Sequence, residues 1–89
     1  LPRRTRLLQN HPNPFNPRTT IRFELATPGR TVIRVFDLRG REVARLLDEE
    51  LPAGRHTVEF APRRLASGIY FTEMRHGETR EVRRLTLLK

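Results

Sequence analysis

The sequence contains no cysteine and no tryptophan. The absence of cysteine excludes disulfides, cysteine-ligated zinc sites and thiol nucleophiles, so the fold must be stabilised by packing alone. The chain also lacks a run of the roughly 18 apolar residues that a transmembrane helix requires, and residues 1–6 lack the apolar core of a signal peptide. It begins with Leu1 and opens on a stretch rich in Pro and Arg. We therefore expect residues 1–6 to be the remnant of a linker, and the chain to be a piece of a longer protein.

Lysine is almost absent, and the net charge of +8 comes from 17 Arg and the single Lys89. A charge of this sign would suit an anionic partner such as nucleic acid, an acidic lipid or an anionic cell-surface polysaccharide. The arginines, however, are scattered along the chain and do not form one basic stripe with aromatic residues between them. This distribution favours a solvated surface and argues against a nucleic-acid partner, while the anionic polysaccharide stays open as a partner.

Side chains that could act in catalysis or bind metal do not fall in the spacings that such chemistry requires. His11, His56 and His76 lie far apart and outside zinc-site spacing. The acidic run at residues 48–50 is typical of a solvated loop before a turn. Ser67 lacks the context of a nucleophile elbow, and no Gly-rich phosphate loop is present. We predict no catalytic, cofactor-binding or metal site, and we interpret His56, on an apolar face, as a core-edge histidine hydrogen-bonded to a neighbour.

A chain of 89 residues has room for one domain with one core. Apolar residues recur with a period of two, and Gly, Pro, Asn or Asp recurs about every 8–12 residues, which is typical of a β-sandwich. Residues 10–17 hold three prolines and are predicted to form a loop. The predicted strands cover residues 20–25, 31–36, 42–47, 55–60, 69–74 and 80–88.

Residues 41–50 leave two interpretations open. Val43, Leu46 and Leu47 fall at helical spacing among good helix formers, which would suit a short amphipathic helix. The segment is short for a helix, and the turns on both sides of it suit a β-meander, which favours a strand. We therefore predict an all-β fold with six or seven strands.

One apolar face of each predicted strand supplies the core. Tyr70, which follows Ser67 and Gly68 near a strand start, is typical of the tyrosine corner of immunoglobulin-like sandwiches. Phe15 and Phe36 are the two aromatic candidates for exposure. The predicted core residues are Ile21, Phe23, Leu25, Ile33, Val35, Val58, Phe60, Tyr70, Met74 and Leu85.

Residues 8–21 read LQNHPNPFNPRTTI. This stretch resembles the opening motif of the C-terminal sorting domains of the type IX (Por) secretion system, which show the pattern Q-N-Y-P-N-P-F-N-P-x-T-x-I. The middle of the chain is also similar to the immunoglobulin-like domain of flagellar hook-capping proteins. Departures from the pattern are His11 for Tyr, residues 60–62 for an aromatic-Asp-Gly turn, and Arg84 for Lys. The similarity continues through residues 35–43, 53–56 and 65–71, ends in residues 84–89, and thus covers residues 7–89.

The resemblance implies an immunoglobulin-like antiparallel β-sandwich of about seven strands, joined to an upstream passenger such as a secreted enzyme or adhesin. Glycoside hydrolases and proteases are the passengers that it implies. An outer-membrane translocon would recognise the domain and a sortase would often remove it. The parent protein would then pass through the periplasm and across the outer membrane, and would be secreted or held at the cell surface. The chain itself would not be an enzyme.

The resemblance assigns the sorting role to the opening motif and to the end of the chain. A terminal strand can be both the last strand of a sandwich and an accessible address for a receptor. The alternative is a non-catalytic polysaccharide-binding module of a secreted enzyme; an exposed coplanar aromatic pair would favour it, whereas burial of Phe15, Phe36 and Tyr70 would favour sorting. The predicted sorting residues are Asn13, Pro14, Phe15, Asn16, Pro17, Gly68, Tyr70, Arg84, Leu85, Leu87, Leu88 and Lys89.

Overall fold

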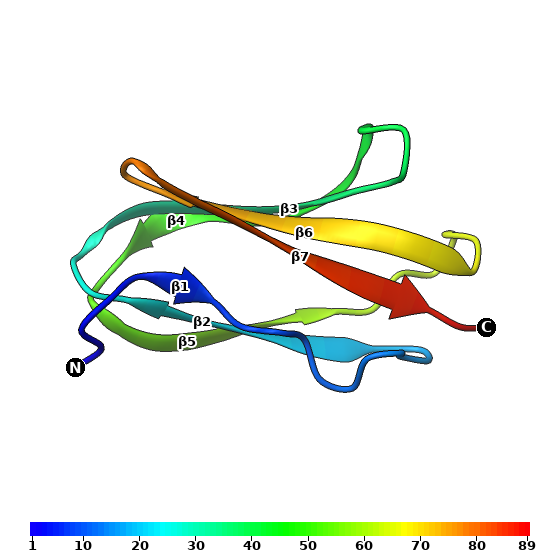
Figure 1. Cartoon of the computed structure of the whole chain (residues 1–89), viewed down its shortest axis with the longest axis horizontal. Coiled ribbons are helices and arrows are strands. Elements are labelled where there is room, and N and C mark those ends of the chain that lie inside the picture. Colours follow the sequence, from blue (N-terminus) through cyan, green and yellow to red (C-terminus); the bar gives the residue numbers. More distant parts are fainter.

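The computed structural model describes residues 1–89 and consists of strands and loops (Figure 1). A three-stranded sheet has the order β1-β2-β5, and a four-stranded sheet has the order β4-β3-β6-β7. The sheets lie over one another as two antiparallel layers, which confirms the expected all-β sandwich of about seven strands. The structure has no helix of the length and apolar character that crossing a bilayer requires. The strands are β1 (Arg6–Leu7), β2 (Thr19–Leu25), β3 (Gly29–Phe36), β4 (Glu42–Leu51), β5 (Gly54–Phe60), β6 (Gly68–His76) and β7 (Thr79–Leu87).

Each of the six strands expected from the sequence is present, with shifted ends. Residues 41–50 form most of β4, which pairs with β3, so the strand interpretation is confirmed and the helical alternative is wrong. The acidic run at residues 48–50 also lies within β4, so its interpretation as a loop is wrong. Two arginines flank Asp48, with Arg30 at 2.7 Å and Arg45 at 3.5 Å from its carboxylate. These ion pairs allow an acidic run to occupy a strand at the edge of the sheet.

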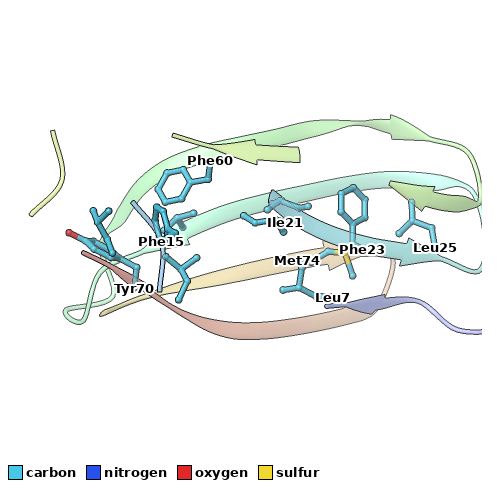
Figure 2. Packing of buried hydrophobic residues seen from close by; sticks show 12 residues of the cluster. Leu7, Phe15, Ile21, Phe23, Leu25, Phe60, Tyr70 and Met74 are labelled. Carbon is cyan, nitrogen blue, oxygen red and sulfur yellow. The ribbon is translucent and has the colours of Figure 1, made fainter. Parts of the chain in front are cut away.

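The core lies between the two sheets, because alternate side chains of each strand point inward. In β2, Ile21, Phe23 and Leu25 are buried while Arg22 is exposed. Nine of the ten predicted core residues are buried, and Val58 is half-buried and packs against them. Figure 2 shows the buried apolar cluster, whose twelve members are Leu7, Phe15, Ile21, Phe23, Leu25, Ile33, Val35, Phe60, Tyr70, Met74, Leu85 and Leu87.

Phe15 is the largest departure from the sequence-based expectation. It was a candidate for exposure, but only 1% of its surface is accessible, so that interpretation is wrong. Its ring centroid lies 5.8 Å from that of Phe60, and the two rings are tilted by 50° (Figure 2). The physical reason is that the backbone of Phe15 pairs with the last strand through an isolated parallel bridge to Leu87, which directs the ring into the sandwich.

The two ends of the sandwich differ in what they carry. The N-terminus lies at one end and the C-terminus at the other, beside the β3–β4 turn and the loop between β5 and β6 (Figure 1). Within the larger sheet, β4 and β7 are the edge strands. An edge strand leaves a row of backbone N–H and C=O groups without sheet partners.

Candidate functional site

The outer edge of β7 is covered by residues 9–17, which we name the opening segment. The Phe15 N–H donates to Thr86 O at 3.0 Å, and the Leu88 N–H donates to Phe15 O at 3.0 Å. Two side chains act in the same way, because Gln9 Nε2 donates to Arg84 O at 2.7 Å and the Thr86 N–H donates to Asn13 Oδ1 at 2.9 Å. Four backbone groups along this edge thus have partners from the opening segment.

The opening segment joins the two sheets. It starts on the smaller sheet, where the N–H of the preceding residue, Leu8, donates to Arg22 O at 2.9 Å. His11 then pairs with Thr20 through two backbone hydrogen bonds of 2.9 and 3.0 Å. It ends on the larger sheet at Phe15. Its prolines have no N–H group to donate, so side chains supply hydrogen bonds in addition to the backbone bonds of His11 and Phe15.

Asn10 and Thr19 supply most of those bonds inside the turn. Both are buried, and Asn10 Nδ2 donates to Thr19 Oγ1 at 3.0 Å and to Pro12 O at 3.1 Å. Thr19 Oγ1 donates to the same carbonyl at 2.8 Å. Because every polar atom of this small network is near a partner, it can sit in the interior without a large desolvation penalty.

Residues 84–89, which we name the terminal segment, divide into inward and outward side chains. Leu85 and Leu87 are buried in the core, whereas Arg84, Leu88 and Lys89 are exposed, with 52% of the Leu88 surface accessible. The end of the segment is held to the neighbouring loop. The Lys89 N–H donates to Ser67 Oγ at 2.9 Å, and Lys89 Nζ donates to Arg63 O at 3.5 Å.

The remaining sorting residues occupy three kinds of position. Asn13, Pro14, Asn16 and Pro17 are exposed in the opening segment. Gly68 begins β6 and pairs with Leu87, while Tyr70 is buried two residues later. All twelve therefore lie in the opening segment, in the terminal segment or in the strand start paired with it.

Tyr70 forms the expected tyrosine corner, because its hydroxyl donates to Ala66 O at 2.6 Å. Replacing Tyr70 with phenylalanine removes this hydrogen bond and keeps the ring in the core. We expect the free energy of unfolding to fall by about 1 kcal/mol, the usual net value of one such bond. Urea unfolding of the two proteins, compared at equal m-values, measures the difference. An unchanged midpoint would show that the hydroxyl adds nothing to stability.

The histidines are not brought together. His56 Nε2 lies 2.8 Å from Pro52 O and its ring stacks on Phe23 at 5.4 Å, so the prediction of a hydrogen-bonded core-edge histidine is confirmed. His76 is buried, with Nδ1 2.8 Å from Thr31 Oγ1, and His11 is exposed. No three His, Cys, Asp or Glu side chains lie close enough to hold a metal ion.

Ten of the 17 arginines are within ion-pair distance of a carboxylate, which accounts for much of the charge as solvated pairs. Arg6 is an example, since it bonds to Glu24 at 2.7 Å across β1 and β2. This hydrogen bond is the main cause that lowers the pKa of Glu24 from its ordinary value. Six of the twelve pairs join neighbouring strands, and the others lie within one strand or involve a residue outside the strands.

Burial of the aromatic residues distinguishes a sorting module from a polysaccharide-binding module. Phe15 and Tyr70 are buried, and Phe36 is half-buried with the Arg34 guanidinium 4.9 Å from its ring centre. The ring face of Phe36 on which a sugar would stack is therefore shared with a cation. Burial of Phe15 and Tyr70 favours sorting, whereas half-buried Phe36 does not meet the expectation of burial.

Two residues outside the predicted set also hold the site together. Glu81 accepts a hydrogen bond from the Leu7 N–H at 2.7 Å, and Gln9 bonds to β7 as described. Gln9 could have been found, because it is the first residue of the Q-N motif. Glu81 carries no such signal, since nothing local distinguishes it from other exposed acids.

Comparison with known proteins agrees with this geometry. Residues 10–87 match the family described as Secretion system C-terminal sorting domain. No curated protein matches the chain. The match starts in the opening segment and ends at the last residue of β7, so it includes residues 10–17 and 84–87 of the site and leaves out Gln9, Leu88 and Lys89. The chain therefore belongs to the family of secretion system C-terminal sorting domains of the type IX system.

Proposed function

We propose that the type IX machinery recognises the terminal segment together with the opening segment that covers its edge. Family membership makes the chain a sorting signal for type IX secretion, and its parent protein is exported to the cell surface or secreted. The observation that carries the proposal is the set of hydrogen bonds from Gln9, Asn13 and Phe15 to the edge of β7. They make the two ends of the motif one structural unit, although more than 70 residues separate them.

In this proposal the two kinds of side chain in the terminal segment have different roles. Leu85 and Leu87 anchor the strand in the core, while Arg84, Leu88 and Lys89 are presented to the receptor. Exposed apolar and basic side chains next to each other suit recognition by a protein surface. Pro14, Asn16 and Pro17 lie in the exposed opening segment and would border the same contact.

The partners in this proposal are an outer-membrane translocon and a sortase, with an upstream passenger joined through residues 1–6. Residues 7–89 form the module, which travels through the periplasm and across the outer membrane with its passenger. The module itself is not an enzyme, and any catalysis belongs to the passenger, for example a glycoside hydrolase or a protease. A non-catalytic role is supported by the composition of the site, which consists of backbone hydrogen bonds, prolines and a basic terminal strand.

The proposal is tested by fusing residues 7–89 behind a periplasmic reporter in a type IX-competent bacterium. We expect export of the intact fusion, and retention of a fusion that lacks residues 84–89. Because truncation also removes core residues, the decisive variant is Lys89→Glu, which at an exposed position shifts stability by no more than about 0.5 kcal/mol. We expect it to export less reporter than Arg22→Glu, which makes a charge change of the same sign and size at an exposed position of β2. Export of the truncated fusion at the intact level would refute the proposal.

A further inference from the structure

The outer face of the four-stranded sheet carries a hollow with an apolar floor. Phe36 of β3 and Phe71 of β6 are register partners, and both alternate with buried residues, so their rings lie on the outer face. With Val82 of β7 they line a hollow of about 520 Å³. The outer face of a sandwich sheet is ordinarily polar, so two neighbouring phenylalanines there call for an explanation.

The β3–β4 turn forms one wall of the hollow and is held rigid by Asp37. The Asp37 carboxylate accepts hydrogen bonds from the Arg39 N–H at 2.9 Å, the Arg41 N–H at 3.0 Å and Arg41 Nε at 3.0 Å. The backbone bond from Arg41 is the main cause that lowers the pKa of Asp37, so this acid stays ionised at neutral pH. Gly40 has a φ of 80°, which suits glycine in the turn.

This turn presents Leu38 to solvent, with 68% of its surface accessible. Leu38 also lines the hollow. A large apolar side chain held in the open by a rigid turn loses little conformational entropy on binding, which favours its use as an anchor. The turn stands at the same end of the sandwich as the C-terminus (Figure 1).

The uncompensated charge around the hollow is positive. Its two acids are already paired, Asp37 with Arg41 at 3.0 Å and Glu73 with Arg80 at 2.6 Å. Beside the lining residues, Arg39 in the β3–β4 turn and Arg84, the register partner of Phe71, are exposed and form no ion pair. A partner that brings negative charge to the rim and an apolar group to the floor would therefore be complementary.

We propose that this hollow, lined by Phe36, Leu38, Phe71 and Val82, is a docking site for an acidic polypeptide segment that inserts a bulky apolar side chain. The inference rests on the proposed function, because it supplies a second contact between the module and the export machinery. A polypeptide is favoured over a sugar, since Arg34 shares the ring face of Phe36. It is favoured over a bilayer, since the apolar floor lies behind a raised turn and a side chain can reach it.

The first test is direct and needs no export. The pentapeptide EEFEE, acetylated and amidated, is titrated into the ¹⁵N-labelled chain, with EEGEE and KKFKK as matched probes. We expect saturable chemical-shift changes at the backbone amides that line the hollow when EEFEE is added. We expect no such changes with EEGEE or KKFKK. Equal shifts with EEGEE, or shifts only outside the groove, would overturn the proposal. So would stronger binding at the groove by dextran sulfate or by phosphatidylglycerol vesicles, which would identify a different occupant.

The second test uses surface variants that leave the terminal segment intact. Leu38→Asp and Arg39→Glu should each weaken EEFEE binding by about tenfold or more, whereas the matched exposed changes Leu1→Asp and Arg22→Glu should not. In a reporter fusion that carries residues 1–89, the first pair should lower export and the second pair should not. If Leu38→Asp and Arg39→Glu are exported normally while the fusion that lacks residues 84–89 is retained, the inference about the hollow is wrong and the proposed function stands. Export of the truncated fusion refutes the proposed function. The peptide titration then decides by itself whether the hollow binds an acidic segment.

Discussion

Replacing Phe15 with alanine is expected to lower the free energy of unfolding by about 3–5 kcal/mol, the usual loss for a buried phenylalanine. The ring is 1% exposed and packs against Phe60. A chain of 89 residues has little stability in reserve, so this change would remove a large share of it. Urea unfolding followed by circular dichroism measures the loss. Phe36→Ala, which removes a half-buried ring from the outer face, is the control and should lose clearly less.

The same variant should also loosen the edge of β7. Phe15 accepts from the Leu88 N–H and donates to Thr86 O, so a poorly anchored residue 15 should leave the Leu88 amide open to hydrogen exchange. The amides of β7 that donate to β6 should exchange only through global unfolding in both proteins, so they serve as an internal reference. If the Leu88 amide exchanges at the same rate in both proteins under native conditions, the ring does not hold the opening segment on β7.

The strands were predictable because their signal is local. In β2, apolar and polar residues alternate over residues 20–25, and in β3 Ile33 and Val35 flank Arg34; this pattern leaves one register with a buried face. Gly, Pro and Asn punctuation sets the turns between them. The resemblance added that the opening motif and the chain end both carry sorting residues, and the hydrogen bonds of Asn13 and Phe15 join these two parts of the chain.

The path of the opening segment was not predictable, because its partners are distant in the sequence. Nothing in a Pro-rich run says which strand edge it will cover, and the bond between Asn13 and Thr86 joins residues 73 positions apart. Phe15 is flanked by prolines and lacks an alternating pattern, so its burial follows from the tertiary pairing with Leu87 alone. The two-residue strand β1 is likewise too short for periodicity to indicate it.

Glu73 gives a similar example among the charged residues. Alternation places it on the outer face of β6, where an exposed acid would be expected, yet it is 4% exposed. Arg34, Arg75 and Arg80 surround it, at 2.5, 3.5 and 2.6 Å from its carboxylate. These arginines come from three strands, so only the sheet order brings them together. A count of charges in the sequence does not show which acid becomes the centre of the cluster.

Replacing Glu73 with glutamine is therefore expected to lower the free energy of unfolding at pH 7 by about 2–3 kcal/mol. Removing one partner of a buried ion pair typically costs about 3–5 kcal/mol, and the value is smaller here because Arg75 and Arg80 remain partly solvated. The loss of stability comes mainly from Arg34. Its Nε already lacks a hydrogen-bond partner, and its guanidinium would lose the ion pair with Glu73. Denaturant unfolding of both proteins at pH 7 gives the difference.

The pH dependence of this difference separates charge from packing. Burial raises the pKa of Glu73, but the hydrogen bonds from Arg34 and Arg80, with the charges of Arg34 and Arg75, outweigh it, so the pKa lies below its ordinary value. A carboxyl group with a lowered pKa in the folded state contributes stability above its unfolded pKa of about 4.3, and loses it as the pH falls through the folded value. The gap between wild type and Glu73→Gln should therefore be full at pH 7 and shrink as the pH falls below the unfolded pKa of about 4.3 and through the lower folded-state pKa, where the native carboxyl group also becomes neutral. Glu78→Gln, an exposed acid without an ion pair in the β6–β7 turn, should leave stability within about 0.5 kcal/mol at either pH. A gap for Glu73→Gln that stays constant down to strongly acidic pH would mean that the shape of the side chain, and not its charge among the arginines, stabilises the sheet.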